Sequence, residues 1–202
     1  GNRISALVDT DTTWMQETIN TAASLGTRRF ELFSSCPPLP AVGIIQIDGR
    51  DYECDPYRSF AVADFYRGIP GGRIKWKRAV ARGTCGGYEV SLHLREASAA
   101  DAGAASNAVF IGGGLHKIED AVLFSTDNDA PSSPWTIRSA ISDLFEIRLF
   151  PSFEHRSGSK LLTLATSARR AIGRFHGFMN IDGARLEIDD FFGFIEEIEL
   201  KL

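Results

Sequence analysis

Three charged side chains fall on sequence faces that are otherwise apolar. Asp64, Arg78 and Glu196 each occupy one position of an alternating segment, with apolar or aromatic residues two positions away on both sides. A buried charge without a partner is strongly unfavourable, so these side chains must find partners in the fold. The natural ion pairs are Asp64 with Arg78 and Arg78 with Glu196.

Two interpretations of these charges stay open. In the first, they form structural ion pairs across strands or at one end of a barrel. In the second, they form the polar floor of an aromatic cavity that orients a mostly apolar ligand. The residues that would line this cavity are Phe60, Tyr66, Trp76 and Arg78. Asp64 or Glu196 would then be a candidate acid–base group, because desolvation raises the pKa of a carboxyl group toward the working range.

Motifs for nucleophilic, metal and phosphate chemistry are missing from the sequence. There is no Gly-x-Ser-x-Gly segment, and the glycine cluster at 112–114 is not followed by Lys and Ser or Thr, as a phosphate-binding loop would be. No two of the four histidines have i, i+2 or i, i+4 spacing. We therefore expect no metal and no cofactor. The alternation places His93 on a solvent face, and His116 is expected to form hydrogen bonds in a loop.

Composition and charge are those of an ordinary globular domain. The net charge of −4 argues against nucleic-acid binding, and no apolar run approaches the ~20 residues that span a bilayer. The cysteines Cys36, Cys54 and Cys85 form no Cys-x-x-Cys pair, so free thiols are expected. This cysteine usage predicts an intracellular reducing compartment, either the cytoplasm or an organelle matrix such as that of the mitochondrion.

The elements that must position these residues differ between the two ends of the chain. Residues 13–16 read Thr-Trp-Met-Gln, the form of a capping box, and the apolar positions that follow share one helical face. The pattern predicts a short helix over 13–25 that ends at Gly26. Three prolines between residues 37 and 40 should then break any regular element.

From residue 42 onward the pattern is that of β-strands. Alternation or short apolar runs predict strands at 42–47, 50–54, 58–66, 73–82, 88–95, 107–111, 115–118, 121–125, 135–139, 144–150, 160–165, 171–181, 185–188 and 194–202. Asp48-Gly49 is a strong hairpin signal between the first two. The fold class is therefore all-β, an antiparallel barrel or strongly bent sandwich with a short N-terminal helix. We divide the chain into an N-terminal helix and Pro-rich connector at 1–40 and a β domain at 41–202.

The order of the motifs resembles a known family. The motifs are Asp64-Phe65-Tyr66-Arg67-Gly68, Lys75-Trp76-Lys77-Arg78-Ala79, Ser106-Asn107-Ala108, Gly114-Leu115-His116-Lys117-Ile118, Gly173-Arg174-Phe175-His176-Gly177, Asp182-Gly183 and Phe192-Gly193-Phe194-Ile195-Glu196-Glu197. From Pro38 to Leu202 the chain resembles DUF2804, a domain of unknown function related to lipocalin-like proteins such as carotenoid 1,2-hydratases and fungal Diels–Alderases. Members tend to read Asp-Trp-x-Arg-Gly at the first motif and to be longer, so this chain resembles an N-terminally shortened member.

The resemblance implies a lipocalin-like barrel and leaves three functions open. The first is a non-catalytic module that binds a small apolar molecule, and the second is a structural accessory subunit with protein partners in a larger, organellar assembly. The third is a cofactor-free hydratase, isomerase or cyclase acting on an apolar polyene-like substrate, with Asp64 as the acid and Arg67 or Arg78 orienting it. The expected ligand-binding residues are Phe60, Tyr66, Arg67, Trp76, Arg78, Asn107, His116, Phe175 and Glu196.

Overall fold

β-Strands make up every regular element in the described part of the chain. The computed structural model describes residues 3–10, 17–24, 26–69, 73–96, 106–127, 133–161 and 164–201. The strands are β1 (Ile4–Thr10), β2 (Ile19–Ser24), β3 (Phe30–Ser35), β4 (Leu39–Ile47), β5 (Arg50–Cys54), β6 (Phe60–Ala61), β7 (Asp64–Gly68), β8 (Arg73–Cys85), β9 (Tyr88–Glu96), β10 (Ala108–Ile111), β11 (Gly114–Lys117), β12 (Val122–Thr126), β13 (Trp135–Ser139), β14 (Phe145–Leu161), β15 (Leu164–Ile181) and β16 (Ala184–Lys201). Within these ranges no helix has the length and apolar character needed to span a membrane.

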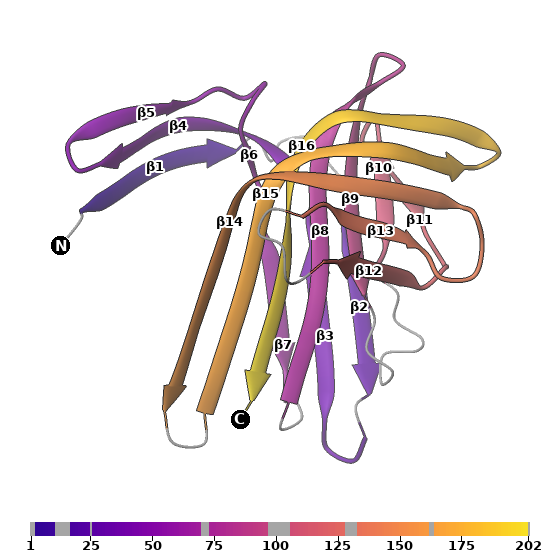
Figure 1. The fold of residues 1–202 in the computed structure, drawn as a ribbon, viewed down its shortest axis with the longest axis horizontal. Coiled ribbons are helices and arrows are strands. Elements are labelled where there is room, and N and C mark those ends of the chain that lie inside the picture. Colours follow the sequence, from indigo (N-terminus) through magenta and orange to yellow (C-terminus); the bar gives the residue numbers. More distant parts are fainter. Residues whose placement is uncertain are drawn as a thin grey trace.

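The strands pair into three antiparallel sheets. The largest has nine strands in the order β11-β10-β9-β8-β16-β15-β14-β13-β12, and it curls so that β12 and β9 approach each other. A second sheet has the order β2-β3-β7, and a third has the order β1-β4-β5 with β6 paired to β4. Figure 1 shows the third sheet projecting from one side of the molecule. The antiparallel, all-β fold class is thus confirmed.

The hydrophobic core fills the inner face of the nine-stranded sheet. Alternation along each strand directs its apolar residues to this face, as Val90, Leu92 and Leu94 do on β9. The largest fully buried side chains are Trp135, Phe145, Phe175 and Phe191. Burial of each contributes about 1.5–3 kcal/mol to folding, so this face is a packed interior.

A bend crosses the middle of the three longest strands. β16 joins two segments that the pattern predicts as separate strands, 185–188 and 194–202, whereas the single strand predicted over 160–165 includes the end of β14 and the start of β15. Figure 1 shows β14, β15 and β16 all changing direction along their length. One row of paired residues here is Pro151, Gly173, Gly193 and Ala81, next to a bulge in β14. A Cβ atom on Gly173 would lie 2.0 Å from the Phe150 carbonyl oxygen, so only glycine allows this approach. We call this row the glycine crease.

The β2-β3-β7 sheet covers the outer face of the nine-stranded sheet. Ile19 of β2 packs with Ala108 and Phe110 of β10, and the rings of Phe33 and His93 lie 5.8 Å apart. Two sheets packed in this way bury both faces of β9, which is why His93 has no solvent exposure. The prediction that His93 faces solvent is therefore wrong.

The predicted N-terminal helix is also wrong over its described part. Residues 19–24 form β2, which pairs with β3 from Ile19 opposite Ser35 to Ser24 opposite Phe30. Gly26 does interrupt the chain, with a φ of 105°, but it lies in the β2–β3 turn rather than after a helix. Burial of Ile19 against β10 favours the strand over the local helical pattern. Residues 11–16, which carry the capping box, lie outside the described residues, as do 97–105, most of a predicted loop.

Candidate functional site

The inner face of the β3–β7 pair supplies one wall of the candidate site. Ser35 pairs with Asp64, and Phe33 pairs with Tyr66. Because side chains alternate along a strand, Asp64 and Tyr66 point the same way, toward the nine-stranded sheet. Arg67 is the neighbour of Tyr66 on β7 and therefore points to the opposite face, where it pairs with Leu32 and is exposed.

A row of charged residues on the nine-stranded sheet faces this wall. Arg170 on β15 pairs with Glu196 on β16, Glu196 with Arg78 on β8, and Arg78 with Arg95 on β9. The row lies three residues from the glycine crease along each of β15, β16 and β8. These side chains share the face opposite the packed core, so each needs a partner there.

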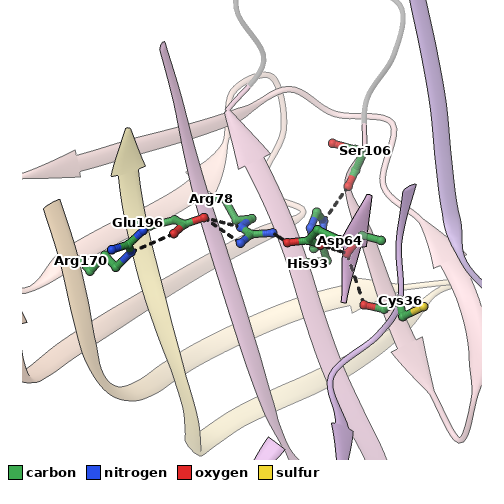
Figure 2. Close-up of polar contacts among 8 residues, drawn as sticks. Cys36, Asp64, Arg78, His93, Ser106, Arg170 and Glu196 are labelled. Atoms are coloured by element: carbon green, nitrogen blue, oxygen red, sulfur yellow. Dashed lines mark hydrogen bonds and ion pairs between the residues drawn. The ribbon is translucent and has the colours of Figure 1, made fainter. Parts of the chain in front are cut away.

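Arg78 is held between two carboxylates. Its Nε donates to Glu196 Oε1 at 2.9 Å, its Nη2 lies 2.7 Å from the same oxygen, and its Nη1 forms an ion pair with Asp64 Oδ2. Arg170 Nε donates to Glu196 Oε2 at 3.2 Å, which completes the chain of contacts in Figure 2. Both ion pairs expected from the sequence, Asp64 with Arg78 and Arg78 with Glu196, are present.

Asp64 has its pKa below the ordinary value of 3.8. Burial acts to raise this pKa, but the hydroxyl of Ser35, which donates to Asp64 Oδ1 at 2.6 Å, and the guanidinium group of Arg78 together outweigh burial. The carboxyl group is therefore ionised at neutral pH. The expectation that desolvation prepares Asp64 as a proton donor is reversed by these two contacts.

A cavity of about 340 Å³ lies between the two walls. Its lining residues are Glu31, Phe33, Asp64, Tyr66, Ile74, Trp76, Arg78, Arg95, Glu196 and Leu200. The structure thus brings together five of the residues singled out from the sequence, which are Asp64, Tyr66, Trp76, Arg78 and Glu196. The lining surface is largely apolar, and its charges gather at the ion pairs.

A second cavity of about 390 Å³ meets the first at the Asp64–Arg78 pair. Both residues line both cavities, and the remaining walls of the second are Phe60, Val62, Ile172, Phe192, Gly193 and Phe194. Phe60 lies here, with its ring 6.0 Å from that of Phe192, rather than with Tyr66 and Trp76. The separation arises because the segment predicted as one strand over 58–66 is divided into β6 and β7.

Three other predicted site residues lie away from both cavities. Phe175 is fully buried in the core on the opposite face of the nine-stranded sheet. His116 is on β11, where its Nδ1 lies 2.7 Å from Asp182 Oδ2. Asn107 is buried, and its side-chain oxygen accepts a hydrogen bond from the Arg95 backbone N–H at 2.6 Å. Asn107 therefore supports the strand that carries Arg95.

Sequence reasoning missed Glu31, Phe33, Arg95 and His93. Glu31 and Phe33 belong to β3, whose alternation is too short to show which face is buried. Arg95 Nη1 lies 3.5 Å from Glu31 Oε1, and its guanidinium group lies 5.4 Å from the centre of the Phe33 ring. The i, i+2 spacing of Glu31 and Phe33, which places both side chains on one face of β3, is the signal that could have indicated this wall.

His93 is a buried imidazole beside the charged row. Its Nδ1 lies 3.0 Å from the Ser106 carbonyl oxygen, and its Nε2 is buried without a hydrogen-bond partner among the described residues. Burial lowers the pKa of His93 to about 4, and the positive charge of Arg78 acts in the same direction. The ring is therefore neutral at physiological pH.

The depressed pKa of His93 predicts acid-sensitive stability. The unfolded chain binds a proton at His93 near pH 6.5, whereas the folded protein binds it only near pH 4. The free energy of unfolding should therefore be highest above about pH 6.5. It should decrease by about 3 kcal/mol as the pH falls toward 4. Urea unfolding from pH 7 to pH 4.5 should show this loss, and His93→Gln should flatten the slope. An unchanged slope in the variant would contradict the assignment.

Comparison with solved structures finds proteins that share this fold. The kievitone hydratase of Nectria haematococca matches 96% of this chain and 61% of its own chain, with a TM-score of 0.57 and 12% sequence identity. CghA matches 98% of this chain and 62% of its own, with a TM-score of 0.52 and 12% identity, and CghA with Sch210972 gives a TM-score of 0.50 over 99% and 62% at the same identity. The chain thus spans about three fifths of the length of these structures, and the likeness shows a shared fold.

Comparison with protein families identifies the chain itself. No curated protein matched the sequence. The model of DUF2804, a domain of unknown function, matches residues 1–202, so the match includes the segment before Pro38 as well as the motifs that follow it. The chain therefore belongs to the DUF2804 family.

Proposed function

We propose that this chain binds a small, mostly apolar molecule in the cavity between β3–β7 and β8–β16. The observation that carries the proposal is a cavity of about 340 Å³ with aromatic and aliphatic walls and a floor of paired charges. This size and this lining are those of small-molecule sites, which hold a few polar groups in a largely apolar surface. The inner face of the nine-stranded sheet is covered by the buried side chains of the hydrophobic core.

The paired floor suits a site that must remain open to an apolar ligand. Arg78 and Arg170 together pair with Asp64 and Glu196, so the cavity can lose its water without leaving an unpaired charge among these four residues. The polar end of a ligand would meet fixed hydrogen-bonding groups, and its apolar body would contact Tyr66, Trp76 and the aliphatic walls. Affinity would come mainly from the apolar contacts and orientation from the charged floor.

Replacement of one aromatic wall tests this proposal. Tyr66→Ala should weaken the binding of decanol or a fluorescent apolar probe by about tenfold, because it removes a large contact surface from the cavity. Tyr57→Ala is the matched control, since Tyr57 is 94% exposed and lies outside this cavity. Fluorescence of the probe, or the intrinsic tryptophan fluorescence to which Trp76 in the cavity wall contributes, would report binding. Equal affinities in the two variants, or no binding by the wild type, would contradict the proposal.

A second candidate function is cofactor-free chemistry in the same cavity. It is supported by the cavity position of the Asp64 carboxylate and by the fold shared with a hydratase. Because Asp64 is ionised, it would act as a proton acceptor or stabilise developing positive charge in the free protein, rather than donate a proton. Turnover of a polyene-like substrate that survives Asp64→Asn unchanged would exclude Asp64 from this role.

A further inference from the structure

The cavity contains more acidic than basic groups. Its lining includes the three carboxylates of Glu31, Asp64 and Glu196 but only the two guanidinium groups of Arg78 and Arg95. Arg170, the other cation that contacts Glu196, has a half-exposed side chain and is outside the lining. A charged ligand group in the cavity therefore meets a lining in which carboxylates outnumber guanidinium groups by one, while Arg170 pairs with Glu196 from outside the lining.

The two cations in the lining are already occupied by carboxylates or aromatic faces. Arg78 directs three of its nitrogen atoms to Asp64 and Glu196. Arg95 lies over the Phe33 ring and beside Glu31. An anionic ligand group would have to compete with these carboxylates for the guanidinium groups and would be repelled by them.

Glu31 is the carboxylate with the weakest partner. It is 8% exposed, and its ion pair with Arg95 measures 3.5 Å, longer than the contacts that hold Glu196 to Arg78 and Arg170. Phe33, Tyr66 and Trp76 also line this cavity. Aromatic faces together with a loosely paired buried carboxylate are the surroundings that stabilise an organic cation.

We propose that the cavity discriminates by charge, binding amphiphiles with an ammonium group in preference to anionic amphiphiles of the same apolar length. This inference rests on the proposed binding function and names the ligand class within it. The neutral alcohol should bind with intermediate affinity, because it neither gains from the excess negative charge nor is repelled by it. Fatty-acid-like anions are thus the disfavoured class.

Three decyl compounds that differ only in the head group test the proposal. Decyltrimethylammonium, decanol and decanoate are titrated into the full chain, with intrinsic tryptophan fluorescence and isothermal calorimetry as readouts. Decyltrimethylammonium is expected to bind about tenfold more tightly than decanoate. If decanol binds but decanoate binds as tightly as the ammonium compound, the charge preference is wrong and the binding function stands. If none of the three binds, the binding function itself fails.

A pair of charge-matched variants separates the cavity from the acidic surface. Glu31→Gln and Glu53→Gln remove the same charge, but Glu53 is exposed on β5 and outside the cavity. Glu31→Gln should reduce the ratio of the two dissociation constants at least about threefold, and Glu53→Gln should leave it unchanged. Phe33→Leu provides a second readout that keeps Glu31, and it should weaken the ammonium compound more than decanol. Equal ratios in all variants would overturn the proposal.

Discussion

Gly193→Ala is expected to be among the most destabilising single substitutions in the chain. A Cβ atom at this position would lie 2.1 Å from the Val80 carbonyl oxygen and 2.6 Å from Ala81 Cα, both on the neighbouring strand β8. Backbone atoms cannot rotate away as a side chain can, so β16 and β8 would have to separate at the glycine crease. We expect a loss of about 3 kcal/mol or more in the free energy of unfolding, measured by urea denaturation.

Gly114→Ala provides the control for this prediction. Gly114 lies in β11, and a Cβ atom there would meet only the Ile111 carbonyl oxygen at 3.6 Å, an ordinary contact distance. The urea concentration at which the Gly114→Ala variant is half unfolded should stay close to that of the wild type. If the two alanine variants unfold at the same urea concentration, the close strand approach at the crease is not what makes glycine necessary.

Arg78→Met is expected to have an effect of similar size through electrostatics. Arg78 is the shared partner of Asp64 and Glu196, whose side chains are 25% and 9% exposed, so its loss leaves two carboxylates without their main cation. Removal of one partner from a buried ion pair costs about 3–5 kcal/mol, and the partial exposure of Asp64 favours the lower end. Thermal or urea unfolding at pH 7 measures the loss, and ligand binding in the cavity should decrease with it.

Two further variants test the electrostatic cause. Arg67→Met removes an arginine from the exposed face of β7 and should change the free energy of unfolding by less than about 0.5 kcal/mol. Adding Asp64→Asn and Glu196→Gln to Arg78→Met removes the unpaired charges and should restore part of the lost stability. A triple variant less stable than Arg78→Met alone would show that lost packing, rather than unpaired charge, dominates.

The sequence was informative where local alternation alone decides the face. Asp64 and Tyr66, and likewise Trp76 and Arg78, lie two residues apart on single strands, so their shared orientation follows from the pleat. Because buried charges need partners, the sequence also predicted that Arg78 pairs with Asp64 and Glu196, and both ion pairs are present. The same alternation places the Arg67 side chain away from the cavity, because Arg67 is one residue from Tyr66 on the same strand.

The features of the site that the sequence does not predict depend on how separate sheets pack against each other. The covering of β9 by β3 is a tertiary contact, and nothing in the local pattern of β9 distinguishes a face covered by a second sheet from one in solvent. His93 was misplaced for this reason, and Glu31 and Arg95 were missed as a pair. Phe175 was assigned to a cavity wall because aromatic composition cannot separate a packed interior from an open one.

β15 and β16 run without interruption through the glycine crease. This continuity should link the stability of the packed interior to ligand binding in the cavity. One half of each strand packs the interior of the curled sheet, and the other half carries the Arg170–Glu196 row beside the cavity. The molecule should therefore unfold as one cooperative unit, with amide protons on both sides of the crease exchanging through the same opening event. A ligand in the cavity would slow hydrogen exchange in the distant interior, although it contacts none of the residues there.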